Sequence, residues 1–317
     1  MQESEKLLSL GFDEFALFFG TTSDEIIKYC DGLIRNKDFR YRIITGKERD
    51  LLILDAIKKI NSEGIPISGR KRYKDWEQGW QENLIEFIHS DYDLDSLIPK
   101  YIKRNVPARL NLEYIIPLSP TFVFDYICVF RAWLFQAYLS EAEIIYEFGC
   151  GPAYHLAYLA SLYSEKKLVG LDWAVSSQKI IDIIRQRFGW NIKGYRFDFF
   201  APERDFFIDK NGAVLTFGAL EQVGAEHQQF LDFLLEKSPS ICINVECLHE
   251  FYNDENLLSY LALLYHRKRN YLFKYLTKLK ELEVEGKIEI IKCHYHKFGN
   301  IYNDTFSYVI WRPKKPI

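Results

Sequence analysis

The segment YEFGCGPAY, residues 146 to 154, has the residue types and spacing of a ligand-binding turn. An apolar run ends in Glu147, and Gly149 and Gly151 follow before a helical pattern begins. Glycine lets the backbone approach a ligand closely, and the free N–H groups at the start of a helix favour an anionic group. The turn therefore predicts a site for a small molecule that carries a carboxylate or a phosphate.

Acidic and aromatic residues follow the next two strand-like runs. Asp172 ends KLVGLD, 23 residues after Gly149, where a carboxylate can accept from both hydroxyls of a ribose. Asp198 follows the third run and is expected to accept from the exocyclic amine of adenine, while Trp173 and Phe199 offer flat apolar faces to the purine. Both NAD and S-adenosylmethionine satisfy this description.

Two residues of the turn discriminate between these cofactors. The dinucleotide fingerprint requires a third glycine where this chain has Tyr154. Glu147 would repel a pyrophosphate, whereas its charge favours the ammonium and sulfonium groups of S-adenosylmethionine. The turn therefore favours S-adenosylmethionine over NAD.

Alternating strands and helices must position these residues. Short apolar runs at 143–148, 167–172, 192–197, 213–218 and 240–246 are separated by helical patterns, which is typical of a mostly parallel sheet with helices on both faces. A long helical stretch is expected over 254–284. Two final strand-like runs at 287–298 and 304–313 predict a terminal hairpin at the sheet edge and bring the count to seven strands.

Residues 141–317 resemble the class I S-adenosylmethionine-dependent methyltransferases. The resemblance is carried by the E-x-G-x-G turn at Glu147, by the two strand-end acids, by TFGALEQ after the fourth strand and by the terminal hairpin. It implies a Rossmann-like α/β fold and S-adenosyl-L-methionine as cofactor. The roles it implies are methionine binding for Gly149 and Gly151, ribose binding for Asp172, adenine binding for Asp198 and a position beside the sulfonium for the segment that includes Gly218.

Three candidates for removing a proton from the acceptor lie where the fourth and fifth strands end. These candidates are Glu221, Glu246 and His249. Strand ends on the carboxyl side of such a sheet face the ligand crevice. Glu246 has the alternative of a structural ion pair, and His249 the alternative of a solvated loop. The basic run 265–276 is either a solvated helix face or a contact for an anionic acceptor.

The first 115 residues carry helical periodicity with few strand-like runs. We expect a helical N-terminal domain at 1–115, which is a lid over the acceptor or a recognition surface, and a methyltransferase domain at 116–317. In the helix expected over 122–139, Asp125 and Arg131 are predicted on an exposed or pairing side. Ser23 and Asp24 are the predicted N-cap residues of an earlier helix.

Composition limits the partners. With 41 Lys and Arg against 44 Asp and Glu, the chain has no basic excess to favour nucleic acid. No run reaches the roughly 18 apolar residues of a membrane span, and we expect a cytoplasmic protein without disulfides or a metal site. Cys293, His294 and His296 are not expected to bind zinc, because the cysteine points away from the two histidines on a strand.

The sequence thus predicts a methyltransferase that acts, most simply by O-methylation, on a small-molecule or carbohydrate-like acceptor, with no nucleic acid and no membrane as partner. Two alternatives stay open. One is a non-catalytic binding protein with the same fold, and the other is a nicotinamide-dependent oxidoreductase, against which Tyr154 counts.

Overall fold

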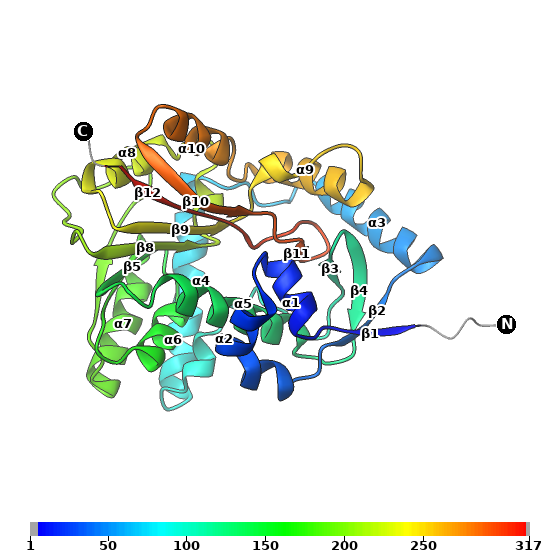
Figure 1. The fold of residues 1–317 in the computed structure, drawn as a ribbon, viewed down its shortest axis with the longest axis horizontal. Coiled ribbons are helices and arrows are strands. Elements are labelled where there is room, and N and C mark those ends of the chain that lie inside the picture. The colour runs from blue at the N-terminus through cyan, green and yellow to red at the C-terminus, as the bar shows by residue number, and fades with distance from the viewer. Residues whose placement is uncertain (1–5, 315–317) are drawn as a thin grey trace.

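Seven strands form the main sheet of the computed structural model, which describes residues 6–314 (Figure 1). The strand order is β10-β12-β9-β8-β5-β6-β7. The strands are β5 (Ile144–Phe148), β6 (Lys167–Asp172), β7 (Ile192–Arg196), β8 (Gly212–Phe217), β9 (Ile241–Glu246), β10 (Ile288–His294) and β12 (Ser307–Pro313). The first five run parallel, whereas β12 lies antiparallel between β9 and β10. The predicted fold class is therefore confirmed, and the last two strands of the sheet form the predicted antiparallel pair at its edge, although the first of them ends at His294 and not at Phe298, which belongs to a second sheet.

Helices cover both faces of this sheet. They are α5 (Phe122–Tyr138), α6 (Tyr154–Leu162) and α7 (Val175–Phe188) on one face, and α8 (Gln228–Lys237) and α10 (Tyr275–Val284) on the other. The period-2 alternation of a strand explains the division, since Ile145 of β5 packs in the first layer and Tyr146 in the second. Both layers exclude water, which leaves the strand ends as the place for a ligand.

The helical stretch expected over 254–284 is two helices. α9 (Leu257–Arg269) ends at Asn270, and α10 begins after Lys274. Both of these flanking residues have left-handed backbone conformations, with φ of 52° and 60°. A helix cannot continue through such a residue, and the periodicity on either side concealed the break.

The N-terminal part contains more than helices. The helices α1 (Phe12–Phe19), α2 (Ser23–Arg35), α3 (Gly46–Ile60) and α4 (Tyr73–His89) are present. The short strands β1 (Leu7–Ser9), β2 (Arg40–Ile43), β3 (Ala108–Leu110) and β4 (Glu113–Pro117) join β11 (Phe298–Gly299) in a second, antiparallel sheet. The expectation of a purely helical segment is corrected on this point, because strands of three to five residues are too short for alternation to reveal.

Thr22, and not Ser23 or Asp24, is the N-cap of α2. Its hydroxyl accepts a hydrogen bond from the Glu25 backbone N–H at 3.3 Å. The predicted start of the helix is therefore displaced by one residue, within the usual uncertainty of a helix end.

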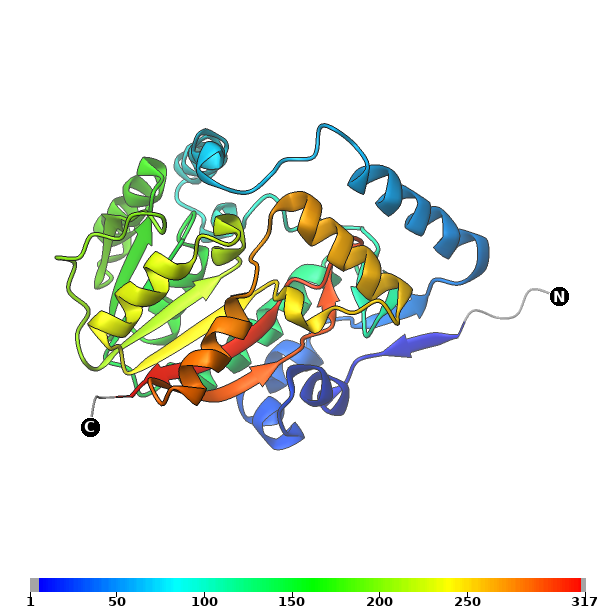
Figure 2. The same ribbon diagram turned by 90° about the horizontal axis from the view of Figure 1, so that it is seen from above.

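The two parts of the chain share one core. A single hydrophobic cluster includes Phe15 and Ile26 from α1 and α2 together with Phe130 of α5 and Ile310 of β12. Figure 2 shows the C-terminal strands passing beside the N-terminal segments. The segments on either side of residue 115 are thus packed against each other.

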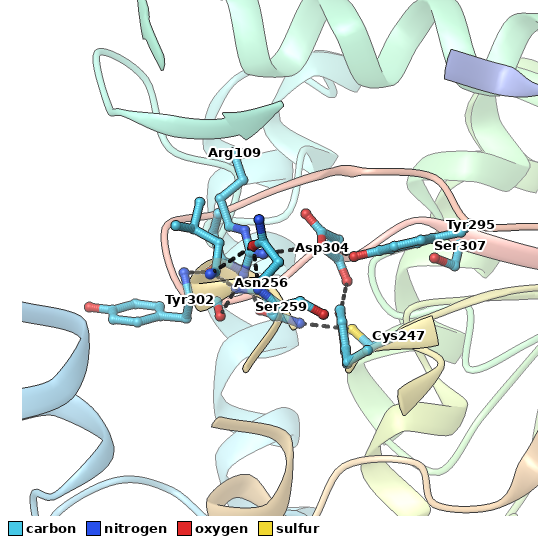
Figure 3. A network of polar contacts seen from close by, with 12 residues as sticks. Arg109, Cys247, Asn256, Ser259, Tyr295, Tyr302, Asp304 and Ser307 are labelled. Atoms are coloured by element: carbon cyan, nitrogen blue, oxygen red, sulfur yellow. Dashed lines mark hydrogen bonds and ion pairs between the residues drawn. The ribbon is translucent and has the colours of Figure 1, made fainter. Parts of the chain in front are cut away.

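A buried polar network also joins the two parts (Figure 3). Arg109 of β3 and Asp304 are both fully buried, with Nη2 and Oδ2 separated by 3.4 Å. Arg109 also donates to the Tyr302 carbonyl at 3.1 Å, and the Tyr295 hydroxyl donates to Asp304 at 2.7 Å. Because a buried charge without a partner is costly, this network holds the loop between β11 and β12 against the second sheet.

Among residues 6–314, no helix is both long enough and apolar enough to cross a membrane. In the same part of the chain, no group of three His, Cys, Asp or Glu side chains is arranged to hold a metal ion.

Candidate functional site

Two adjoining cavities lie at the carboxyl ends of β5, β6 and β8. The first contains about 500 Å³ and the second about 380 Å³ of space between the atoms, part of which is open to solvent. The first is lined by Trp76, Trp80, Gly149, Asp172, Trp173, Phe197, Phe199, Phe200, Gly218, Ala219, Gln222 and Val223. The second is lined by Trp76, Trp80, Pro99, Tyr101, Glu147, Gly149, Cys150, Gly151, Pro152, Tyr154, His155, Phe217 and Gly218. Most of the predicted cofactor-binding residues are therefore gathered around these two cavities.

The glycine turn is held closely against its neighbours. Gly149 has a φ of 72°, and a Cβ added there would lie 2.3 Å from the Cβ of Ala219. Its backbone N–H donates to the Leu171 carbonyl at 2.6 Å. Glycine is thus required by the close packing of this turn on the loop after β8, as well as by any ligand that passes over it.

Asp172 hydrogen-bonds both to the glycine turn and to the loop after β6. One carboxylate oxygen accepts from the Gly151 N–H at 2.9 Å and the other from the Ala174 N–H at 2.9 Å. Burial raises the pKa of Asp172 to about 6, although these two N–H donors oppose the shift. Each oxygen keeps a second lone pair, so the predicted contact to ribose is compatible with these bonds.

Glu147 is a buried carboxylate in the wall of the second cavity, with only 1% of its surface exposed. Its Oε2 atom has no hydrogen-bond partner among the described residues. Burial raises the pKa of Glu147 well above its usual range, and the nearby positive charge of Arg131 opposes this rise. An unpartnered buried carboxyl group beside a cavity is suited to a cationic ligand group.

Arg131 lies behind this wall and is also buried. Its guanidinium packs over the rings of Tyr154 and Tyr158, at 4.2 and 4.1 Å from the ring centroids. Asp125, the other charged residue of α5, accepts from the Thr121 hydroxyl at 2.6 Å and lies 3.3 Å from Lys37. Both side chains are thus buried and not on an exposed side; Asp125 is paired, whereas Nε and Nη1 of Arg131 have no hydrogen-bond partner among the described residues.

Aromatic rings form the far wall of the first cavity. Trp173 stacks on Phe200 with ring centroids 6.2 Å apart, and Phe199 meets Phe197 edge to face. Trp173 and Phe199 thus both line the first cavity, and their contact with a purine stays a prediction. A Cβ added at Gly218 would meet no atom within 4 Å, which shows that this residue borders open space.

Asp198 is the predicted cofactor residue that the structure leaves outside the lining of both cavities. It accepts from the Phe200 backbone N–H at 2.9 Å and lies 3.8 Å from Arg70. Its side chain is 40% exposed. The carboxylate thus shapes the loop that carries Phe199 and Phe200, and the predicted contact to adenine has no support from its position.

Helix α4 and the loop after it cover the cavities from the N-terminal part of the chain. Trp76 and Trp80 stack on each other with ring centroids 5.4 Å apart, and the Trp80 ring packs on Gly151. Tyr101 lines the second cavity, although 57% of its surface is exposed; desolvation of its hydroxyl end and the charges of Glu221 and Glu147 raise its pKa. The N-terminal part therefore contributes directly to the site.

Glu246 is fully buried and accepts three backbone hydrogen bonds. The donors are the N–H groups of Ala219, Leu220 and Glu221, at 3.1 to 3.2 Å. Burial and the charge of Glu221 raise the pKa of Glu246 to about 8. This carboxyl group holds the loop after β8 in place and does not line either cavity, so its geometry is that of a structural residue.

Glu221 is half-buried and is held by two side-chain donors. The Cys247 thiol donates to one carboxylate oxygen at 2.9 Å, and the Gln222 amide donates to the other at 2.9 Å. Asn303 in turn donates to the Cys247 sulfur at 3.1 Å. Burial raises the pKa of Glu221. Glu221 does not itself line a cavity, although it adjoins Gln222 in the first and acts electrostatically on Tyr101 in the second.

His249 lies away from both cavities. Its Nδ1 is 2.9 Å from the Glu250 carboxylate, and its ring stacks on Phe273 with centroids 4.5 Å apart. Glu250 in turn accepts from the Thr277 N–H at the start of α10. The structure therefore does not bring His249 together with the other candidate residues.

Several lining residues were not predicted as site residues. In the sequence, Trp76 and Trp80 show only the i, i+4 spacing of two residues on one helix face, which is as typical of core packing as of a ligand site. His155 follows the glycine turn directly, is buried, and has no partner for its Nδ1 atom among the described residues. Burial and the charge of Arg131 hold its pKa well below its usual range. Tyr101 carries no sequence signal at all, because only the folded chain brings it to the cavity.

Methyltransferases are among the solved structures that resemble this fold. Human N-acetylserotonin methyltransferase in complex with S-adenosylmethionine aligns with 83% of this chain and 66% of its own, at 12% identity and a TM-score of 0.47. This chain thus spans just under two thirds of that human protein. An S-adenosylmethionine-dependent methyltransferase from Aquifex aeolicus aligns with 56% of this chain and 86% of its own, at 13% identity and a TM-score of 0.40.

A third structure, the small RNA methyltransferase HEN1, aligns with 58% of this chain and 24% of its own, at 13% identity and a TM-score of 0.42. No protein-family model matches the sequence, and neither does any curated protein. At these identities and TM-scores the matches say nothing about the site, so function is inferred from its own residues.

Proposed function

We propose that this protein is an S-adenosylmethionine-dependent methyltransferase that acts on a small-molecule or carbohydrate-like acceptor through O-methylation. The observation that carries the proposal is Glu147, which lines the cavity beside the glycine turn and whose Oε2 atom has no hydrogen-bond partner among the described residues. A cofactor with an ammonium group in the second cavity and an adenosine in the first would supply the missing partner.

The residues around the two cavities fit such a cofactor. Glu147 would hold the ammonium group, Asp172 would accept from the ribose hydroxyls, and Trp173 and Phe199 would contact the purine. Gly218 borders open space between these subsites. When bound, S-adenosylmethionine supplies a methyl group on a positively charged sulfur.

The chain's task in such a transfer is to align the acceptor, exclude water and take up a proton. Trp76 and Trp80 cover the cavities and would keep water out. Of the three predicted catalytic residues, Glu221 remains the candidate base, because its side chain is half-buried and burial raises its pKa above the ordinary value of a glutamate. A base works best when its pKa is close to the working pH, because a useful fraction of it is then deprotonated while it still has a strong tendency to take up the proton.

The N-terminal residues that cover the second cavity favour a small acceptor. Trp76, Trp80, Pro99 and Tyr101 line the second cavity from segments outside the main sheet. The charge balance of the chain, 41 basic against 44 acidic residues, supplies no general attraction to a polynucleotide. Nucleic acid is therefore the less favoured acceptor.

Calorimetric titration with S-adenosylhomocysteine tests the proposal, with NAD titrated in parallel. We expect micromolar binding of S-adenosylhomocysteine and none of NAD. Transfer of a labelled methyl group to a panel of sugars, phenols and short RNAs then tests the acceptor class. Failure of a folded sample to bind S-adenosylhomocysteine would overturn the cofactor assignment, and transfer to RNA alone would overturn the acceptor class.

A non-catalytic binding protein is the alternative that one observation favours. Glu246 and His249, two of the three expected catalytic residues, are engaged in structural contacts. Binding of the cofactor without transfer to any member of the panel would support this alternative.

A further inference from the structure

Only four residues line both cavities: Trp76, Trp80, Gly149 and Gly218. The two glycines belong to the loops after β5 and β8, whereas both tryptophans come from α4. A ligand that extends from one cavity into the other must pass between the glycine pair and the tryptophan pair. The helix α4 therefore lines the ligand site together with the loops after β5 and β8.

We propose that α4 is part of the cofactor site, with Trp76 as a ligand-binding residue whose indole N–H donates to the bound molecule and Glu77 as the positioning residue that fixes the helix. The identity of the ligand rests on the proposed function. The assignment of these two residues rests on the geometry of α4.

The indole nitrogen of Trp76 supports a direct contact. Nε1 is buried and has no hydrogen-bond partner among the described residues. Indole is a donor only, and a buried donor without an acceptor is costly. The Trp76 ring packs against Trp80 on one side and beneath the Arg72 guanidinium, 5.4 Å from its centroid. Neither neighbour offers an acceptor, and a ligand oxygen or nitrogen in the adjoining cavity would satisfy the N–H.

Glu77 and Gln81 hold α4 in this position. The Glu77 carboxylate accepts from the backbone N–H groups of Val175 and Ser176, at 2.6 and 3.2 Å, and from the Ser176 hydroxyl at 2.5 Å. The side-chain oxygen of Gln81, one turn further along, lies 2.9 Å from the same hydroxyl and shares its single proton with Glu77. A carboxylate at the N-terminus of α7 is favoured by the helix dipole as well as by these bonds.

The spacing of these residues couples the anchor to the ligand. Trp76 and Glu77 are adjacent, and Trp80 and Gln81 are adjacent one turn later, so each tryptophan is next to a residue that binds α7. The N-terminus of α7 directly follows Asp172 and Trp173, which line the first cavity. If Glu77 no longer bound the N-terminus of α7, the tryptophans of α4 would therefore be free to shift relative to Asp172 and Trp173.

The first test is the affinity for S-adenosylhomocysteine of Trp76→Phe, which keeps an aromatic ring but removes the N–H. We expect a 2- to 10-fold weaker Kd, the range that corresponds to one neutral hydrogen bond. Trp190→Phe is the matched control, because Trp190 stacks on Phe188 at the opposite end of β7 and should leave Kd unchanged. An unchanged Kd for Trp76→Phe would overturn the assignment of Trp76.

The second test compares Glu77→Gln with Glu82→Gln. Glu82 is on the same helix and pairs only with the exposed Lys100. We expect Glu77→Gln to increase the dissociation rate of S-adenosylhomocysteine at least 3-fold and Glu82→Gln to leave it within error. Equal rates for the two variants would overturn the positioning role.

Hydrogen exchange on the unmodified protein provides a readout that needs no substitution. S-adenosylhomocysteine should slow amide exchange in α4 as well as in residues 149–154. Slower exchange at 149–154 with no change in α4 would overturn the inference and leave the proposed function intact. No binding at all by the unmodified protein would instead overturn the proposed function.

Discussion

At the scale of single residues, four carboxyl groups in and around the site differ in their hydrogen-bond partners. Asp172 and Glu246 accept backbone hydrogen bonds, Glu147 has an unpartnered oxygen, and Glu221 is held by a thiol and an amide. All four are acids near the ends of parallel strands, yet Glu147, Asp172 and Glu221 retain capacity for a ligand or a proton, whereas Glu246 is occupied by three backbone N–H groups. The partners of each group, and not its residue type, indicate its role.

Replacing Glu147 should affect ligand binding and the stability of the fold differently. We expect Glu147→Gln to weaken S-adenosylhomocysteine binding at least 10-fold, because a charge-assisted contact to the ammonium is lost. The free energy of unfolding should stay constant or rise, since a buried carboxyl group without a full set of partners is removed. Calorimetry and urea unfolding measure the two effects.

The pH dependence of binding provides a second check on the same residue. Burial raises the pKa of Glu147, and only its ionised form attracts an ammonium. Affinity should therefore increase as the pH rises, and this increase should be smaller in Glu147→Gln, where Asp172, with a pKa of about 6, still titrates. A variant that keeps the pH dependence of the unmodified protein would contradict the assignment.

Glu221 is the residue whose replacement should affect turnover most. With any acceptor hydroxyl identified in the screen, Glu221→Gln should lower kcat by about 10² to 10⁴, the usual contribution of a positioned base. The Kd for S-adenosylhomocysteine should change by less than about 3-fold, as expected for an interaction made only in the transition state. A kcat within a factor of two of the unmodified value would exclude Glu221 as the base.

At the scale of elements, the loop after β8 depends on β9. Glu246 at the end of β9 accepts from three consecutive N–H groups of that loop, which carries Ala219 and Glu221 and follows Gly218. The N-terminal helix α4 depends in the same way on α7, through Glu77. Both walls of the site are thus fixed by a carboxylate from a neighbouring element.

Glu246→Gln tests whether this carboxyl group is structural. An amide nitrogen cannot accept from the Glu221 N–H, so we expect the free energy of unfolding to fall by about 1–3 kcal/mol. Asp232→Asn, on the exposed side of α8, serves as the control for a surface acid. Loss of turnover with full stability would instead restore Glu246 as a catalytic residue.

At the scale of the whole molecule, buried histidines link stability to pH. His296 is fully buried at the junction of both parts of the chain, with Nε2 2.8 Å from the Tyr126 hydroxyl and Nδ1 3.2 Å from the Phe306 carbonyl. Burial lowers its pKa to about 3. The unfolded chain therefore binds a proton that the folded chain excludes when the pH lies between about 3 and 6.5.

The sign of this linkage makes the contribution of His296 fall as the pH drops below about 6.5. Between pH 7.5 and pH 5 the stability advantage of the unmodified protein over His296→Gln should shrink by about 2 kcal/mol. Urea unfolding at several pH values measures the difference, and His89→Gln, at an exposed position on α4, is the control. An advantage that does not change with pH would contradict the buried, neutral state.

The sequence by itself determined the main sheet. All five parallel strands lie within one residue of their predicted ends, because strands covered on both faces read as short apolar runs between helical patterns. The glycine turn with Glu147 and Asp172 was equally readable, since strand ends on one side of a parallel sheet must meet at one edge. This information is local and periodic, so one sequence suffices to find it.

Only the tertiary structure decided which residues surround that edge and what each one does. The strands of the second sheet are too short for a periodic signal, and the break at Asn270 lies between two regular helical patterns. Trp76 and Tyr101 reach the cavities across large separations in the chain, and Glu246 and His249 are occupied by backbone and side-chain partners that no spacing reveals. Burial and hydrogen-bond partners depend on long-range packing, and they distinguish a structural acid from one that is free to bind or react.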